Sequence, residues 1–248
     1  MFLRSFFLLV PVLVCCTVLA FLYGVIGWSD TSSGPRVILP QSGYPLAKKP
    51  IRRILILGTS LTSRGNWPEE LGQRLSACAN ADVIVTRLAR PGATSSWGLK
   101  ALNDYFGQIG SKSPDILITE FSGNDASLYH GFPLYVSHKN HLKILELANS
   151  KSVIVFLATM SPAWGMNALE RPGQSRYHAL YRELAVREHI GLIDTVLTWS
   201  DLPLTERTKF VPDGLHPSED GMHVITVPAF FEALKPIVCA ESEGSIDD

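Results

Sequence analysis

The sequence has no excess of charge of either sign. Its 22 Lys and Arg residues are balanced by 23 Asp and Glu residues, and the isoelectric point is near 6.7. A surface that binds nucleic acid needs clustered basic residues, so this balance argues against a nucleic-acid partner. Internal repeats and low-complexity tracts are also missing, and 248 residues suffice for one α/β domain with an appendage. We therefore expect a small or neutral molecule as the partner.

Cysteine is scarce, and its four residues fall into two groups. Cys15 and Cys16 lie in an apolar stretch near the N-terminus, which leaves two others, Cys78 and Cys239, for the folded part. In an oxidising compartment Cys78 and Cys239 could form a disulfide. We favour slightly the alternative of two separate buried thiols, because free cysteine behaves as a small apolar residue.

The histidines do not form the pattern of a metal site. His130, His138 and His141 lie near one another, but no cluster of acidic or thiol residues accompanies them. We therefore predict no metal and no cofactor. His178 and His189 fall on an expected helix, and we expect them at its surface.

Residues 6–26 form an apolar stretch of 21 residues without a charged side chain. As a helix with a rise of about 1.5 Å per residue, this stretch spans about 30 Å, the thickness of a bilayer core. A cleaved signal peptide has a shorter apolar region, so we favour a single-pass membrane anchor over residues 1–28 and keep cleavage and secretion as the alternative. Arg4 precedes the stretch and Asp30 follows it, which predicts a cytoplasmic N-terminus and an extracytoplasmic domain.

The rest of the chain divides into a linker over 29–50, a folded domain over 51–240 and a flexible tail over 241–248. The linker is rich in Ser, Gly and Pro, whereas the domain alternates short apolar runs with amphipathic stretches. We expect strands at 51–58, 81–89, 114–122, 151–159 and 190–195, and helices at 68–77, 96–109, 135–148, 174–189 and 218–234.

This alternation predicts an α/β fold, with a five-stranded parallel sheet between two layers of helices. Parallel strands that are buried on both faces have nearly continuous apolar sequences, as these runs do. Ligands of such sheets bind at the carboxyl ends of the strands. We therefore expect functional residues in the segments that directly follow the strands.

Three of these segments carry groups that suit ester chemistry. Ser60, in the turn GTS (58–60), follows the first strand and places a hydroxyl at the mouth of the sheet. Gly92 follows the second strand, and its backbone N–H can approach a bound oxygen without obstruction. Asn124, in SGND (122–125), offers a side-chain amide after the third strand. Each alone is ordinary turn chemistry, so their common placement carries the argument.

A fourth segment, PDGLHP (212–217), places Asp213 and His216 three residues apart, close enough to share one turn. A serine hydroxyl is a weak nucleophile at neutral pH and needs a base to take its proton. An imidazole that is oriented by a carboxylate supplies such a base.

In this order, the four segments resemble the sequence blocks of the SGNH (GDSL) hydrolase family over roughly residues 51–236. The resemblance implies a flavodoxin-like fold and a serine esterase or acyltransferase. It makes Ser60 the nucleophile, His216 the base and Asp213 the carboxylate that orients it. It assigns the oxyanion hole to the backbone N–H groups of Ser60 and Gly92 and to the Asn124 amide. The family's GDS is GTS in this chain, so the acidic residue before the serine is missing.

The expected function is hydrolysis of short-chain or acetyl esters, on envelope glycans if the domain faces outward. Two alternatives stay open. An O-acyltransferase would use the same site with a sugar hydroxyl in place of water. A flavodoxin-like domain without catalysis would hold a phosphate at loop 58–65, although that loop lacks the lysine of a Walker motif, or would bind a carbohydrate.

Trp164, after the fourth strand, is a further candidate for the site. Its ring could form a stacking wall for a sugar or an acyl chain. A loop aromatic that covers the core explains this residue about equally well.

Overall fold

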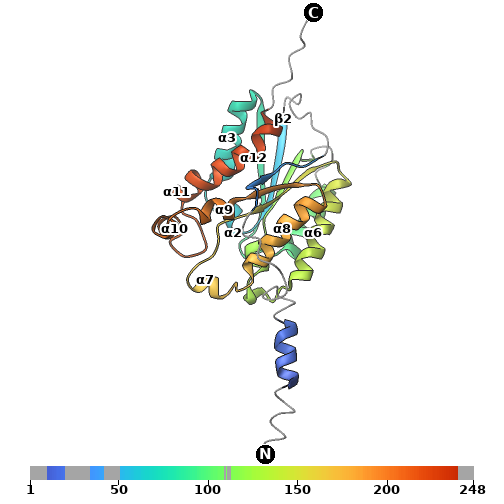
Figure 1. Ribbon diagram of the computed structural model, residues 1–248. Helices are drawn as coiled ribbons and strands as arrows, with labels where there is room; N and C mark the ends of the chain where they lie inside the picture. The colour runs from blue at the N-terminus through green and yellow to red at the C-terminus, as the bar shows by residue number, and fades with distance from the viewer. Residues whose placement is uncertain (1–9, 20–33, 42–50, 109, 111–112, 240–248) are drawn as a thin grey trace, which may run out of the picture.

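The computed structural model describes residues 10–19, 34–41, 51–108, 110 and 113–239. Its centre is a six-stranded sheet with the order β1-β6-β5-β4-β2-β3 (Figure 1). Five strands, β2 to β6, run parallel, which confirms the predicted α/β class. The strands are β1 (Val37–Ile38), β2 (Ile51–Gly58), β3 (Asp82–Ala89), β4 (Ile116–Thr119), β5 (Ile154–Thr159) and β6 (Gly191–Asp194).

Strand β2 is apolar along most of its length because it is enclosed on every side. It lies between β3 and β4, and four consecutive side chains from Ile54 to Leu57 are at most 1% exposed. An alternating pattern would place polar groups on one of the two covered faces, where they would lack water. The strand ends at Gly58, so the next residues emerge at the carboxyl edge of the sheet.

Helices cover both faces of the sheet. One face packs against α3 (Trp67–Ala79) and α12 (Val227–Val238). The other face packs against α4 (Ser95–Gln108), α6 (Leu134–Asn149) and α8 (Gln174–Arg187). Figure 1 shows α3 and α12 on the opposite side of the sheet from α6 and α8. The short helical segments are α2 (Ser60–Ser63), α5 (Ser122–Asp125), η2 (Leu128–His130), α7 (Met166–Leu169), α9 (Thr195–Ser200), α10 (Leu204–Phe210), α11 (Glu219–Gly221) and η3 (Met222–Thr226).

The sixth strand corrects the prediction of a five-stranded sheet. β1 lies in the segment predicted as a linker and pairs antiparallel with β6, with Val37 opposite Ile193. A strand of two residues is too short to show an apolar period, so the sequence pattern does not reveal it. Residues 29–33 and 42–50 of the predicted linker and the predicted tail 241–248 lie outside the described part of the chain.

The predicted membrane anchor is described only in part, as an exposed apolar helix over Val10–Leu19. Within the described residues, one helical stretch is long and apolar enough to cross a membrane, Glu219–Val238. More than half of that stretch is buried, because it forms the C-terminal helix of the domain core. The anchor over residues 1–28 therefore stays a prediction.

Cys78 in α3 and Cys239 after α12 form a disulfide, with their Cα atoms 5.5 Å apart. This pairing corrects our slight preference for two separate thiols. The two residues are 161 positions apart in the sequence, and packing of α3 against α12 on one face of the sheet brings them together. Cys15 and Cys16 are free and exposed.

Replacing both Cys78 and Cys239 by serine should lower the free energy of unfolding by about 2–5 kcal/mol, because a cross-link over a long loop restricts the unfolded chain. Urea unfolding without reductant measures the change. The matched control replaces Cys15 and Cys16, whose loss should leave the midpoint unchanged. An unaltered midpoint in the first variant would contradict the disulfide.

Candidate active site

The first part of the site is the turn between β2 and α2, where Ser60 begins the short helix. Thr59 caps this helix, because its Oγ1 accepts the Leu61 N–H at 3.2 Å. Gly58 is required before it, since a Cβ there would collide with the Glu120 carboxylate. Ser60 is 6% exposed, so its hydroxyl has a fixed direction and a narrow opening to solvent.

A buried carboxylate, Glu120, holds this turn from the end of β4. Its Oε1 accepts the Thr59 N–H at 2.6 Å and the Thr62 hydroxyl at 2.7 Å. Burial raises the pKa of Glu120 to about 7, and the hydrogen bonds from Thr59 and Thr62 oppose that rise. No pattern in the sequence identifies Glu120, because its partners lie about 60 positions away.

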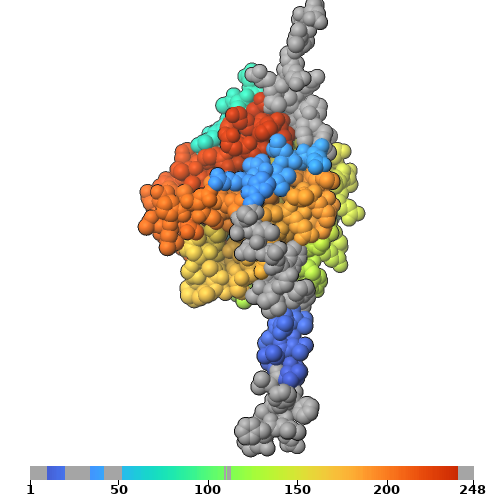
Figure 2. Space-filling model, viewed as in Figure 1, coloured from blue at the N-terminus to red at the C-terminus, as the bar shows by residue number. Residues whose placement is uncertain are grey.

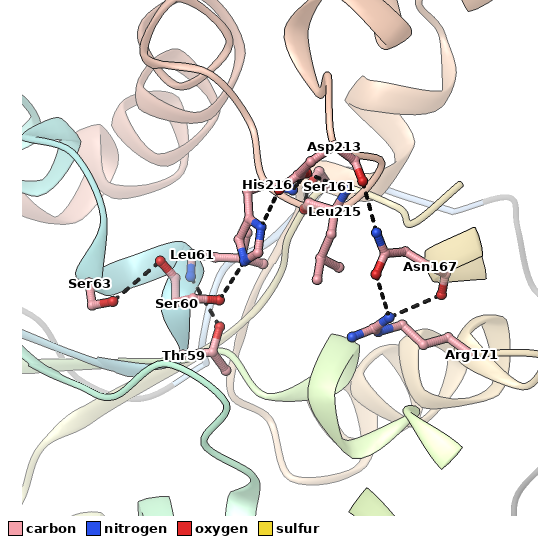
Figure 3. A network of polar contacts seen from close by, with 10 residues as sticks. All are labelled: Thr59, Ser60, Leu61, Ser63, Ser161, Asn167, Arg171, Asp213, Leu215 and His216. Atoms are coloured by element: carbon pink, nitrogen blue, oxygen red, sulfur yellow. Dashed lines mark hydrogen bonds and ion pairs between the residues drawn. The ribbon is translucent and has the colours of Figure 1, made fainter. Parts of the chain in front are cut away.

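The second part of the site is the loop that carries Asp213 and His216 (Figure 3). The His216 Nε2 atom lies 2.9 Å from Ser60 Oγ, and the His216 Nδ1 atom lies 2.7 Å from Asp213 Oδ2. The other oxygen, Oδ1, accepts the N–H groups of Leu215 and His216 at 2.9 and 2.6 Å. The structure thus brings Ser60, His216 and Asp213 into one hydrogen-bonded line across 156 positions.

The carboxylate of Asp213 is set to be charged at neutral pH. Its partial burial raises the pKa, but the backbone and side-chain hydrogen bonds with His216 outweigh this and lower the pKa below the ordinary value. An ionised carboxylate at Nδ1 keeps the imidazole proton on that nitrogen, which leaves Nε2 free to accept a proton.

Gly214 lets the loop turn between these two residues. It has φ of +75°, and a Cβ there would lie 2.6 Å from the Trp164 backbone oxygen. Trp164 also donates its backbone N–H to the Gly214 oxygen at 2.9 Å, while its side chain packs against a small apolar cluster around Trp199. These contacts give Trp164 a structural role, and its contact with substrate stays a prediction.

A buried cation connects the loop to the rest of the site (Figure 3). Arg171 donates from Nε to the Gly123 oxygen at 2.9 Å and from Nη1 to the Asn167 oxygen at 3.0 Å. Asn167 in turn donates from Nδ2 to the backbone oxygen of Asp213 at 2.8 Å. Arg171 therefore joins the segments after the third and fourth parallel strands to the loop of Asp213. The sequence pattern does not reveal this role, since the oxygens of Gly123 and Asn167 that accept these two bonds belong to the backbone.

A cavity of about 10 Å³ opens beside Ser60 at the carboxyl edge of the sheet. Asn124 lines it and donates from Nδ2 to the Ala93 backbone oxygen at 2.9 Å. Gly92 precedes Ala93 with φ of +72°, is exposed and is not among the residues that line this cavity. The structure thus places Asn124 at the cavity and Gly92 in the adjacent turn.

Two residues of α8 also line the cavity, and the expectation for one of them was wrong. His178 is 5% exposed rather than on the helix surface, and it lies one turn after Gln174 on the inner face of α8. Burial lowers the pKa of His178 to about 3, helped by the charge of Arg182. His178 is therefore neutral at physiological pH and lines the cavity without adding a charge.

Residues 55–224 match the model of the GDSL-like Lipase/Acylhydrolase family. The chain belongs to this family. Membership makes the protein an ester hydrolase, as the comparison with solved acylhydrolases and esterases also supports. No curated protein matches the chain by sequence.

Solved structures of this fold include a lipase/acylhydrolase from Enterococcus faecalis, which is 26% identical with a TM-score of 0.62 and shares 74% of this chain and 95% of its own. An aryl esterase from M. smegmatis is 16% identical, has a TM-score of 0.60 and matches over 75% of this chain and 99% of its own. A carbohydrate acetylesterase family member from Sinorhizobium meliloti is 16% identical and has a TM-score of 0.59. The match covers 76% of this chain and 100% of that protein's chain.

Glu120 makes this GDSL-like hydrolase less stable as the pH rises. Because burial holds the folded-state pKa at about 7, above the ordinary 4.5, the free energy of unfolding should fall by about 3 kcal/mol between these pH values. Glu120→Gln removes the titration, so its stability relative to wild type should increase across that window. Urea unfolding at several pH values measures this. The exposed Glu146→Gln serves as control, and parallel curves for wild type and Glu120→Gln would contradict the assignment.

Proposed function

We propose that this protein is a serine esterase in which Ser60 attacks the ester carbonyl and His216 takes the serine proton. The observation that carries the proposal is the 2.9 Å contact between Ser60 Oγ and His216 Nε2, with Asp213 behind the ring. This arrangement makes a weak hydroxyl nucleophilic at the moment of attack. A phosphate-binding or carbohydrate-binding loop has no need of a base at this distance, which favours catalysis over binding alone.

The reaction proceeds in two halves. In the first, Ser60 Oγ bonds to the carbonyl carbon, and His216 passes the proton that it has accepted to the departing alcohol. In the second, His216 takes a proton from water as the water oxygen attacks the acyl group on Ser60. His216 then returns this proton to Ser60 Oγ as the bond between Oγ and the acyl carbon breaks and the acid leaves. Asp213 stabilises the imidazolium that forms in each half.

The carbonyl oxygen of the ester becomes negatively charged during the attack, and hydrogen-bond donors must stabilise it. We assign this role to the backbone N–H groups of Ser60 and Gly92 and to the side-chain amide of Asn124. An amide nitrogen carries two hydrogens, and the bond from Asn124 to Ala93 uses one of them. That bond orients the amide, and the second hydrogen is available at the cavity beside Ser60.

The acyl group is small, because the cavity beside Ser60 holds about 10 Å³, which is room for about one water-sized group. Among acyl groups, an acetyl group needs the smallest movement of the lining side chains, whereas a long acyl chain would need a much larger one. The same fold occurs in a carbohydrate acetylesterase family member. We therefore infer an acetyl or short-chain ester, carried on a glycan.

We also propose that residues 1–28 anchor the protein in a membrane and that its catalytic domain lies outside the cytoplasm. The disulfide between Cys78 and Cys239 supports an oxidising compartment, because such bonds persist there and are rare in the cytosol. The apolar helix Val10–Leu19 lies within the predicted span.

Ser60→Ala should fold normally and lose turnover of p-nitrophenyl acetate by a factor of about 10⁴ or more, because no other group replaces the nucleophile. The matched control is Ser63→Ala in the same helical turn, whose hydroxyl donates to the Ser60 backbone oxygen at 3.4 Å. A fluorophosphonate probe should label wild type and not Ser60→Ala. Retained turnover in Ser60→Ala, or no labelling of wild type, would refute the esterase.

Asn124→Ala should lower kcat by about 10²–10³ with little change in KM, since the amide contacts charge that exists only in the transition state. Steady-state kinetics with p-nitrophenyl acetate separate the two parameters. Asn103→Ala, an exposed asparagine of α4, is the control. A raised KM with normal kcat would argue against the oxyanion role.

A further inference from the structure

The direction of β1 determines where the chain enters the domain. β1 is antiparallel to β6, so it begins at the edge of the sheet where the five parallel strands end. The Arg36 oxygen accepts the N–H of Asp194, the last residue of β6, at 2.7 Å, and the Arg36 side chain pairs with Asp201. The N-terminal part of the chain therefore joins the domain at the same edge as Ser60.

The connection to the predicted anchor is short. Nine residues, 27–35, separate the end of the apolar stretch from Arg36. Even fully extended they reach only about 30 Å, at about 3.3–3.6 Å per residue, whereas a domain of this size is about 40 Å across. The membrane therefore lies nearer to the carboxyl edge of the sheet than to the opposite edge.

Apolar side chains are exposed at this edge. Tyr129 is 86% exposed, Met166 75% and Leu169 71%, the highest values among large apolar residues in the described part of the chain. Leu128 is 47% exposed, and its N–H donates to the Glu170 oxygen at 2.8 Å, which joins η2 to the end of α7. We call Leu128, Tyr129, Met166 and Leu169 the apolar rim.

The apolar rim lies beside the catalytic loop. Helix α7 carries Met166 and Leu169, and between them Asn167 donates to the Asp213 oxygen at 2.8 Å. The yellow segment that includes α7 protrudes at the lower end of the domain in Figure 2. Exposed apolar groups of this kind mark an interaction surface, and here two of them lie on the helix that contacts the loop of Asp213.

We propose that the apolar rim rests in the surface of a lipid bilayer, so that the catalytic edge faces the membrane and receives esters presented there. The proposal rests on the membrane anchor proposed above. Transfer of leucine and methionine side chains from water to the acyl region lowers their free energy, and tyrosine favours the headgroup level. Glu170, the acidic residue that follows Leu169, is paired with Arg171 at 3.4 Å, which reduces the cost of approach to the bilayer.

The test uses the full chain in vesicles of phosphatidylcholine and phosphatidylglycerol. Leu169 is replaced by the photoreactive p-benzoylphenylalanine, and the control carries the same replacement at Val186. Val186 is 64% exposed and lies near the end of α8, about 18 Å along the helix from Gln174 at the cavity. After irradiation, lipid adducts should be at least tenfold more abundant at position 169 than at position 186.

Equal adducts at the two positions, or none at position 169, would overturn the proposal. Flotation of the vesicles tests the anchor on the same samples, and a chain that does not float with lipid also overturns the orientation. Turnover of p-nitrophenyl acetate by the same preparations reports on the esterase separately. Active protein without adducts at position 169 therefore rejects the membrane-facing edge and leaves the proposed reaction intact.

Discussion

The hydrogen bond between Ser60 Oγ and His216 Nε2 is the contact on which the proposed chemistry depends. It joins two turns that lie at opposite ends of the domain sequence, so both must be held in place independently. Glu120 fixes the turn of Ser60, while Asn167 and Trp164 hold the loop of His216 through backbone groups. A displacement of about 1 Å in either turn is enough to lower the rate strongly.

Buried polar groups provide this support. Their removal from water is unfavourable in free energy, and hydrogen bonds within the site offset it. Glu120 loses its hydration, which its raised pKa reflects, but the Thr59 N–H and the Thr62 hydroxyl both donate to it. Arg171 likewise gains partners in two segments, at Gly123 and Asn167, when it leaves water. Groups that are satisfied in this way have one stable orientation, and they transmit that rigidity to the reacting side chains.

Topology adds a second constraint at a larger scale. A parallel sheet collects the ends of its strands at one edge, which is why Ser60, Asn124 and the loop of Asp213 converge although they are far apart in sequence. The antiparallel β1 brings the N-terminal part of the chain to that same edge. One two-residue strand thus relates the position of the reaction to the position of the predicted anchor.

The sequence by itself determined the α/β class, the five parallel strands and the order of the four segments at their ends. These signals are local, because continuous apolar runs and short motifs depend only on neighbouring residues. Only the tertiary structure decided that β1 joins the sheet, that Cys78 pairs with Cys239, and that Glu120 and His178 are buried at the site. Each of these depends on contacts between segments that are distant in the sequence, and a local pattern does not indicate which distant group a side chain will contact.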